Sequence, residues 1–256
     1  LMEIVIFESP EEVCSAAAGI IRRALQKKPD QVLGLATGRT MEGVYKNLRG
    51  ADFSQVKTFN LDEYVGVGAD HPGSYAYYMH EHLFNHVQIS PSNIHLLDGL
   101  APDPEAECEA FEQAIQRAGG IDIQLLGLGE NGHIAFNEPG SSLASRTRFK
   151  TLASATLASN KELFPGEELP RHGLTMGVSN ILESRLCLLL AYGRRKAQAL
   201  AYMAEGPVTA MCPASVLQFH PHTIALVDEE AALQLSMVDY YRLSYEEKPE
   251  RLKYPP

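Results

Sequence analysis

One stretch of the sequence combines residue types suited to proton transfer with residue types suited to binding an anion. Residues 127–140, GLGENGHIAFNEPG, directly follow the apolar run 121–126, so a buried strand is expected to end in a glycine-rich loop. Glycines let backbone N–H groups approach an anionic ligand closely, because no Cβ stands in the way. His133 can exchange protons near neutral pH, and the Glu138 carboxylate can hold its ring in one tautomer. We interpret this loop as a site of acid–base chemistry on a small anionic or polar substrate.

A tight turn with an incidental histidine is the alternative interpretation of the same loop. The pair Asn131-Gly132 is typical of a β-hairpin turn. The residues that follow it, however, do not alternate between apolar and polar as a paired strand would. The hairpin interpretation is therefore the weaker one.

Two further loops carry residues that could complete such a site. Residues 35–40, LATGRT, lie between an expected strand and an expected helix, and their backbone donors, hydroxyl groups and helix N-terminus suit a phosphate group. The segment lacks G-x-G-x-x-G and G-K-S/T, so an ordinary turn is its alternative interpretation. Residues 60–64, NLDEY, end another expected strand, where Asp62 and Glu63 point to opposite faces and only one can face the site. A carboxylate beside a desolvated cleft can have its pKa raised into the range of a proton acceptor, whereas a solvated strand end would have no catalytic role.

A cluster of histidines needs a separate interpretation. His82 and His86 would share one face of a helix, and His80 precedes them. Two histidines at this spacing can bind zinc, but the order H-E-x-x-H is absent and no third ligand is evident. We interpret the cluster as a solvated helix face and predict no metal site.

Composition favours an enzyme of the cytoplasm and disfavours several partners. The chain has 256 residues and a formal net charge of −10, which argues against nucleic acid, because phosphate backbones require a basic face. Its four cysteines show no C-x-x-C or zinc-like spacing and are expected to be reduced thiols. The longest apolar run, near residues 186–191, is too short to span a bilayer. We therefore predict a cytoplasmic protein that binds a small molecule.

Strand-like and helix-like segments alternate along the chain. Strands are expected at 3–7, 32–36, 56–61, 94–97, 121–126, 185–192 and 224–227, and helices at 10–27, 40–48, 74–84, 104–118, 194–204 and from Asp228 onward. Such alternation with short connections predicts an α/β fold in three layers, Rossmann-like, with a mostly parallel sheet between helices. Ligands of such sheets bind beyond the carboxyl ends of the strands, where all three loops fall. We predict one domain over residues 1–243 and a charged peripheral tail over 244–256.

Taken together, the motifs resemble those of the glucosamine-6-phosphate deaminase family. The resemblance rests on a T-G-x-T loop at 37–40, LDEYV at 61–65, the long motif at 127–140, and PASVLQFH at 213–220. It implies a Rossmann-like fold and the conversion of glucosamine 6-phosphate and water to fructose 6-phosphate and ammonia, a step of amino sugar catabolism that uses neither metal nor cofactor.

The resemblance also implies a role for individual residues. His133 would open the sugar ring at the ring oxygen, with Glu138 tuning and orienting it. Asp62 would remove the proton from C2 and return it at C1. Asn131 stands where some members have aspartate, which there completes a carboxylate–histidine–carboxylate relay. The phosphate would be held by Thr37, Gly38, Arg39, Thr40 and Lys196.

Departures from the family pattern concern the phosphate contacts. Met41 stands where the phosphate loop usually has proline. The segment SNKELF at 159–164 aligns with a family segment that supplies an arginine, and Glu162 takes the place of that arginine. A desolvated carboxylate facing a phosphate is repulsive. Either Lys161 turns inward or Arg39 supplies the missing cation. Ser142, Arg148 and Lys150 match the amino-sugar allosteric site of regulated hexameric members, although the segment is equally consistent with a solvated basic turn.

Several functional alternatives stay open at the level of sequence. The substrate could be galactosamine 6-phosphate, and a sugar-phosphate lactonase is a more distant enzyme with the same broad fold. A non-catalytic sugar-phosphate sensor is the competing class, but it would have no use for Asp62, His133 and Glu138 together. The sequence leaves open whether the chain forms a homo-oligomer.

Overall fold

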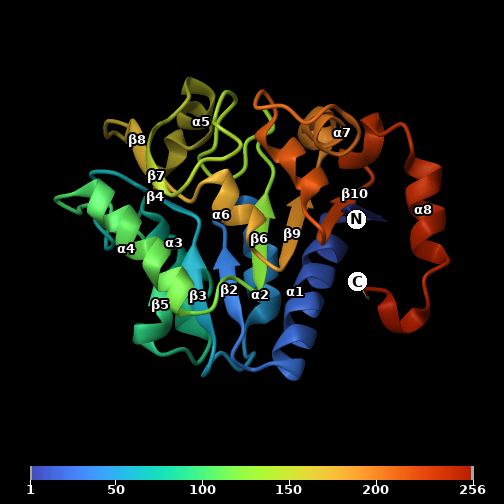
Figure 1. The fold of residues 1–256 in the computed structure, drawn as a ribbon, viewed down its shortest axis with the longest axis horizontal. Coiled ribbons are helices and arrows are strands. Elements are labelled where there is room, and N and C mark those ends of the chain that lie inside the picture. The colour runs from blue at the N-terminus through green and yellow to red at the C-terminus, as the bar shows by residue number, and fades with distance from the viewer. Residues whose placement is uncertain (1, 255–256) are drawn as a thin grey trace.

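The computed structural model describes residues 2–254, and its centre is a seven-stranded sheet in which every neighbouring pair is parallel (Figure 1). The strand order is β1-β10-β9-β6-β2-β3-β5. The bounds are β1 Met2–Phe7, β2 Val32–Leu35, β3 Lys57–Asn60, β5 Ile94–His95, β6 Ile123–Gly127, β9 Leu186–Ala191 and β10 Thr223–Asp228. The central strands are buried on both faces and are mainly apolar, as is typical of parallel strands between helices, with Gln124 of β6 as a buried polar residue. The predicted α/β fold is confirmed.

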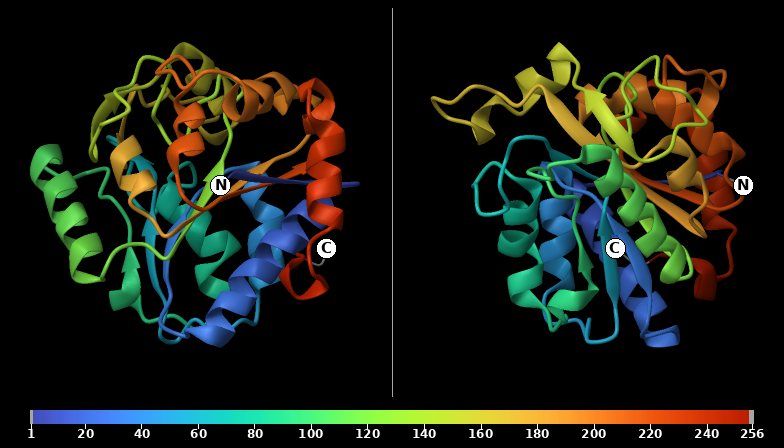
Figure 2. Two further views of the ribbon diagram at one scale, coloured as in Figure 1. Left: turned by 45° about the vertical axis from the view of Figure 1, so that its right-hand side comes forward. Right: turned by 60° about the vertical axis from the view of Figure 1, so that its left-hand side comes forward.

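Helices cover both faces of this sheet. On one face α1 (Pro10–Lys27) packs against α2 (Arg39–Leu48), which contacts α3 (Tyr75–His82). On the opposite face lies α4 (Pro104–Arg117), whose Phe111 meets Phe59 of β3 edge to face (Figure 2). The remaining helices are α5 (Ser154–Ser159), α6 (Val178–Leu182), α7 (Ala197–Glu205) and α8 (Val238–Glu246). No helix in the described part of the chain is both long and apolar enough to cross a membrane.

Local sequence explains where the long helices begin. Ser9 caps α1 by accepting a hydrogen bond from the backbone N–H of Glu12, and Pro10 occupies the first turn. Asp103 caps α4 in the same way. By contrast, Gly38 precedes α2 with no side-chain cap and a φ of 104°, a left-handed conformation that favours glycine. In the first turn the Met41 N–H donates to the Gly38 carbonyl oxygen, whereas the N–H groups of Arg39 and Thr40 have no acceptor within the helix and can meet a ligand.

The order of the strands reverses between β2 and β6. From β2 the chain proceeds through β3 to β5 on one side, whereas β6 continues through β9 to β10 on the other. The loops that leave β2 and β6 therefore diverge and open a crevice at the carboxyl edge of the sheet. Both loops carry the motifs selected from the sequence.

A second, antiparallel sheet lies over this edge and was not predicted. It contains β4 (Asp62–Tyr64), β8 (His172–Thr175) and β7 (Arg148–Thr151) in the order β4-β8-β7. Asp62 therefore begins a strand of the small sheet; it does not end a strand of the large one. A separate apolar cluster supports this layer and contains Tyr64, Val67, Tyr75, Phe136, Leu152 and Phe164.

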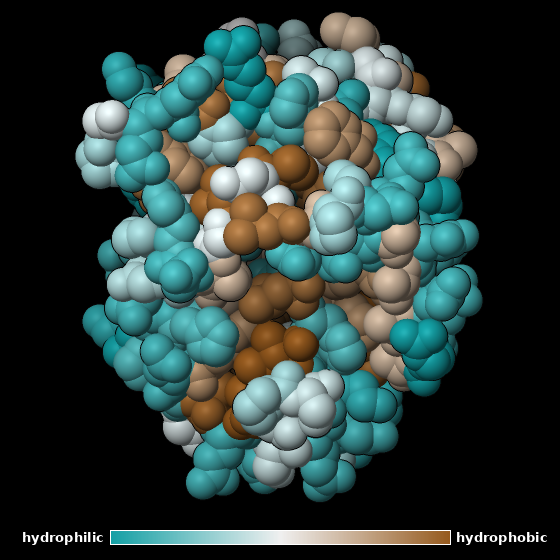
Figure 3. Space-filling model, turned by 90° about the vertical axis from the view of Figure 1, so that its left-hand side faces the viewer, coloured by the Kyte–Doolittle hydropathy of each residue, from teal (hydrophilic) through white to brown (hydrophobic). Residues whose placement is uncertain are grey.

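The edge of the large sheet at β5 is short. This strand has two residues where four were predicted, because the ladder with β3 joins Thr58 to Ile94 and Phe59 to His95 only. The face on this side of the molecule is largely polar, with apolar side chains gathered in a band through its middle (Figure 3). A short edge strand offers few unpaired backbone groups to another chain.

The carboxyl-terminal part differs from the prediction in one respect. A helix from Asp228 was expected, but β10 includes Asp228, a 3-10 helix follows at Ala231–Gln234, and α8 begins at Val238. The reason is that the Asp228 carboxylate accepts hydrogen bonds from the backbone N–H groups of Gly193 and Ala231, which holds it in a turn. The tail after α8 returns to β1, where Lys248 contacts Glu3 and the Tyr254 hydroxyl donates to Glu3.

Candidate active site

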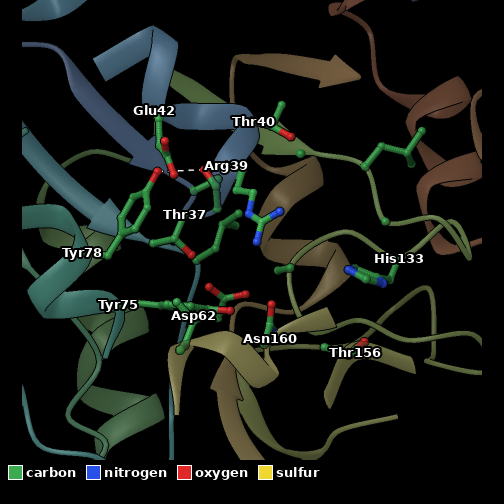
Figure 4. Close-up of a pocket in the computed structure, with 18 of the residues that line it drawn as sticks. Thr37, Arg39, Thr40, Glu42, Asp62, Tyr75, Tyr78, His133, Thr156 and Asn160 are labelled. Atoms are coloured by element: carbon green, nitrogen blue, oxygen red, sulfur yellow. Dashed lines mark hydrogen bonds between the residues drawn. The ribbon is translucent and has the colours of Figure 1, made fainter. Parts of the chain in front are cut away.

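A cleft of about 1320 Å³ opens above the carboxyl ends of the central strands. One wall is a segment that we call the strap, residues 153–164, which contains α5 and the 3-10 helix Lys161–Leu163. Figure 4 shows Thr37, Arg39, Asp62 and His133 around the same space. Of the predicted site residues, the cleft is lined by Thr37, Gly38, Arg39, Thr40, Asp62, Asn131, His133 and Lys196.

A hydrogen-bonded chain of three side chains fixes His133. The Asn131 amide nitrogen donates to Glu138 Oε2 at 3.0 Å, and Asn131 Oδ1 lies 2.6 Å from His133 Nδ1. The Glu138 carboxylate only accepts, so the amide must turn its NH2 group toward Glu138 and its oxygen toward the imidazole. That oxygen also only accepts, so Nδ1 must carry the ring proton. Nε2 is therefore left with a free lone pair.

Glu138 acts on this histidine through Asn131. Its Oε2 lies 3.6 Å from His133 Nδ1, whereas the shorter contact belongs to the amide. The sequence predicted that Glu138 orients the ring; in the structure the Asn131 amide lies between them and makes the contact with the ring. Glu138 lies behind the cleft wall, buried, and accepts a second hydrogen bond from the Thr156 hydroxyl of the strap.

Desolvation sets the charge state of His133. Burial lowers the pKa of the ring below its ordinary value; Glu138 opposes this shift and Lys196 adds to it. The side chain keeps 25% of its exposure, and the ring reaches the cleft. At neutral pH the ring is uncharged and suited to accept a proton.

The shape of the histidine loop depends on small residues. A Cβ at Gly129 would lie 2.3 Å from His133 Nδ1, so only glycine leaves space for the ring. Ala135 has a φ of 49°, the only positive value for a non-glycine residue between residues 2 and 254. Such a conformation is strained for an L-residue and persists where the surroundings enforce it. Ala135 lines the cleft between His133 and Glu138.

Asp62 and Glu63 face opposite sides, as the alternation along a strand predicts. Asp62 lines the cleft, is 7% exposed, and has a pKa raised well above its ordinary value by burial and by the charge of Glu63. Glu63 instead accepts hydrogen bonds from the backbone N–H groups of Tyr75 and Ala76 at the start of α3. Asp62 is thus the carboxylate available to a ligand, and its raised pKa favours proton transfer.

The loop after β2 brings an anion-binding geometry to the opposite wall. Thr37, Gly38 and Thr40 lie at the N-terminus of α2, whose positive dipole end favours negative charge. Lys196 faces them from the segment after β9, and burial lowers the pKa of its ammonium group. This wall suits a phosphate group.

Arg39 does not stand free at this wall. Its guanidinium pairs with the Glu162 carboxylate of the strap, and the two side chains are 82% and 78% exposed. Glu162 lines the cleft in this structure, and Lys161 is exposed beside it. Which of Arg39 and Lys161 supplies the missing cation stays a prediction. The carboxylate that replaces the family arginine is balanced by Arg39.

The residues considered for regulation lie outside the cleft. Arg148 and Lys150 are on β7, and Ser142 follows the histidine loop. Arg148 donates a hydrogen bond to the buried amide oxygen of Asn137 at 2.9 Å. Regulation at these residues stays a prediction.

Sequence reasoning did not identify several residues of the cleft. On the strap, Asn160 donates to the Tyr64 hydroxyl at 2.6 Å. Beside Lys196, Arg194 and Arg195 line the mouth and pair with Glu230 and Glu130. The run Gly-Arg-Arg-Lys after a buried strand could have pointed to the two arginines. No sequence pattern could have pointed to the strap residues, because their contacts depend on the fold.

Comparison with known proteins identifies the class to which this geometry belongs. The sequence profile described as glucosamine-6-phosphate isomerases/6-phosphogluconolactonase matches residues 8–226. The chain belongs to this family.

Individual relatives narrow the comparison. The chain is 49% identical to the glucosamine-6-phosphate deaminase of Arthrobacter sp. (strain FB24), over 97% of this chain and 98% of the relative. It is 47% identical to glucosamine-6-phosphate deaminase 2 of Bacillus subtilis (strain 168), over 93% of this chain and 100% of the relative. A solved monomeric glucosamine-6-phosphate deaminase superposes with a TM-score of 0.89 at 42% identity, covering 91% of this chain and 100% of that one. The 6-phosphogluconolactonase of Trypanosoma brucei, at 18% identity and a TM-score of 0.75, shares the fold.

Proposed function

We propose that this protein converts glucosamine 6-phosphate and water to fructose 6-phosphate and ammonia. The observation that carries the proposal is the placement of Asp62 and His133 in one cleft with the anion-binding start of α2. A sugar phosphate anchored at that helix would extend between the carboxylate and the imidazole. The relatives that cover nearly the whole chain are named for this deamination.

Ring opening is assigned to His133. Because Nδ1 is bound to Asn131, Nε2 can take the proton of the anomeric hydroxyl while the bond between C1 and the ring oxygen breaks. The proton is then delivered to the ring oxygen, which becomes the C5 hydroxyl. Glu138, held by Asn131, stabilises the imidazolium that exists between the two transfers.

Isomerisation is assigned to Asp62. Its buried carboxylate has a raised pKa, so it is a stronger base than an exposed aspartate. It removes the proton from C2 while the C1 carbonyl oxygen takes a proton from the substrate's own ammonium group, which forms an enolamine. Asp62 then returns its proton at C1, which leaves a protonated imine at C2. Water adds to that imine, and ammonia leaves. The cationic amine of the incoming substrate would favour the ionised form of Asp62.

Phosphate binding is assigned to Thr37, Gly38, Arg39, Thr40 and Lys196. The first-turn N–H groups of α2 supply donors, and Lys196 supplies a charge in a partly desolvated place. The phosphate would compete with Glu162 for Arg39. We also propose a cytoplasmic location, since all four cysteines are free and buried.

A coupled assay tests this function. Ammonia and fructose 6-phosphate should appear in equal amounts from glucosamine 6-phosphate, with galactosamine 6-phosphate run in parallel. Release of neither product from either sugar would overturn the proposal, and hydrolysis of 6-phosphogluconolactone in their place would assign the protein to the other branch of the family.

A further inference from the structure

Tyrosine hydroxyls hold the backbone carbonyls of the loop that leads into α2. The Tyr78 hydroxyl donates to the carbonyl oxygen of Gly38 at 2.8 Å, and the Tyr192 hydroxyl donates to that of Arg39 at 3.2 Å. The Tyr45 hydroxyl donates to the carbonyl oxygen of Ala36. These tyrosines come from three elements: α3, the segment after β9, and α2 itself.

The geometry of the peptide bond links these contacts to ligand binding. In a trans peptide the C=O of one residue and the N–H of the next point in opposite directions. Fixing the Gly38 carbonyl fixes the Arg39 N–H, and fixing the Arg39 carbonyl fixes the Thr40 N–H. Carbonyls at a helix start point along the helix, so these N–H groups point back toward the cleft. In Figure 4, Tyr78 reaches toward the start of α2 beside Glu42, away from Asp62.

Within the turn itself, the backbone N–H of Met41 donates to the Gly38 carbonyl oxygen at 2.9 Å, so the Tyr78 hydroxyl is the second donor to that oxygen. Gly38 provides no side-chain cap, and its φ of 104° is one that glycine adopts freely. A turn that contains glycine and orders its backbone only when a ligand binds loses conformational entropy in that step. Hydroxyls from neighbouring elements order the turn beforehand.

The three hydroxyls stay protonated donors across the physiological range. Burial raises the pKa of Tyr192 to about 12, and the nearby Cys14 and Glu42 add to the shift. Burial also raises the pKa of Tyr45 and of Tyr78 far above the ordinary tyrosine value. A carbonyl oxygen has two lone pairs, so it can accept a hydroxyl proton together with a helical N–H.

We propose that Tyr78 and Tyr192, with Tyr45 behind them, are positioning residues that preorganise the backbone N–H groups of residues 37–40 for the substrate phosphate. This inference rests on the proposed function, because it assigns the phosphate to this loop. The tyrosines act through the peptide planes, and Tyr45 has no access to the cleft at all, being fully buried.

Tyrosine-to-phenylalanine variants test the inference, because they remove only the hydroxyl. In Tyr78→Phe and Tyr192→Phe, KM for the sugar phosphate and the inhibition constant of inorganic phosphate should both rise about three- to tenfold, the effect of one lost hydrogen bond. The two effects should multiply in the double variant, while kcat stays within about twofold. Tyr45→Phe should show the same split together with a lower Tm. Tyr240→Phe on α8, an exposed tyrosine away from the cleft, is the matched control.

The possible outcomes distinguish a failure of the positioning role from a failure of the proposed function. A lower Tm or lower kcat with unchanged KM and unchanged phosphate inhibition would overturn the positioning role. Weaker phosphate binding in Tyr78→Phe and Tyr192→Phe, with unchanged binding in Tyr45→Phe, would mean that the hydroxyls of Tyr78 and Tyr192 contact the ligand directly. That result would also overturn the inference. A wild-type protein that neither releases ammonia nor is inhibited by phosphate would instead refute the proposed function.

Discussion

Replacing Glu162 with glutamine should tighten substrate binding, although Glu162 makes an ion pair in the folded protein. Its carboxylate pairs with Arg39 across the mouth of the cleft, and both side chains are mostly exposed, at 78% and 82%. If Arg39 binds the phosphate, Glu162 is a competitor for that guanidinium. Removing the competitor leaves Arg39 free before the substrate arrives.

The exposure of the pair sets the size of the effect. An exposed ion pair contributes at most about 1 kcal/mol, a factor of roughly five in a binding constant. Glu162→Gln should therefore lower KM by about two- to fivefold. A charge-assisted contact to phosphate contributes about 1.5–3 kcal/mol, so Arg39→Ser should raise KM by about tenfold or more. The phosphate thus outcompetes the carboxylate.

The assay is a double-mutant cycle on KM with glucosamine 6-phosphate. In the Arg39→Ser background, Glu162→Gln should recover only the part of KM due to direct repulsion between carboxylate and phosphate. All effects should shrink as ionic strength rises, because exposed charges are screened. Glu168→Gln is the matched control, since Glu168 is also exposed, pairs with Arg171 in the next segment, and lies outside the cleft.

A rise in KM for Glu162→Gln would refute this reasoning. It would mean that the ion pair closes the strap over the substrate and that Arg39 serves the strap. An unchanged KM in Arg39→Ser would remove Arg39 from the phosphate site and leave Lys196 as its cation.

Three further predictions concern His133 and the hydrogen bonds that connect it, through Asn131, to Glu138. Asn131→Asp should raise the pKa of His133, because a carboxylate replaces an amide beside Nδ1. Activity that needs the neutral ring is then lost at a higher pH on the acid side, and an NMR titration, with His133→Gln to assign the resonance, should show the shift. His133→Gln should impair turnover of the cyclic sugar more than that of an open-chain substrate, and equal losses would mean that the histidine does more than open the ring. Thr156→Val should lower kcat by up to about tenfold, because it removes a hydrogen bond to the Glu138 carboxylate. The control Thr151→Val, on the partly exposed β7, should leave kcat unchanged, and equal kcat values in the two variants would contradict a role for the strap in holding Glu138.

The parallel sheet was predictable because its signals are local. Apolar runs such as Leu186–Ala191 mark strands buried on both faces, and caps such as Ser9 mark helix starts. The loops at 35–40 and 127–140 follow such strands, so the sequence also placed them at the same edge of the sheet. Alternation predicted that only one of Asp62 and Glu63 faces the site, and the family resemblance selected Asp62.

The small sheet and the strap were not predictable in this way. Its strands β7 and β8 are each four residues long, and β7 is partly exposed. β8 pairs with β7 on one side and with β4, which is far away in the sequence, on the other. No periodic pattern marks them, because their stability comes from the cluster around Tyr64 and Phe136. The Thr156 hydroxyl and the tyrosines at the phosphate loop meet their partners only through tertiary structure.

Proton exchange at C2 tests the central assignment most directly. Asp62 is the cleft carboxylate with a raised pKa, and its removal should abolish the transfer from C2 to C1. In deuterium oxide, wild-type protein should incorporate deuterium into the product at C1, whereas Asp62→Asn should lose exchange and ammonia release by about 10²-fold or more. Inhibition of Asp62→Asn by inorganic phosphate should remain, because the phosphate wall is intact. Exchange that continues at the wild-type rate in Asp62→Asn would contradict the account.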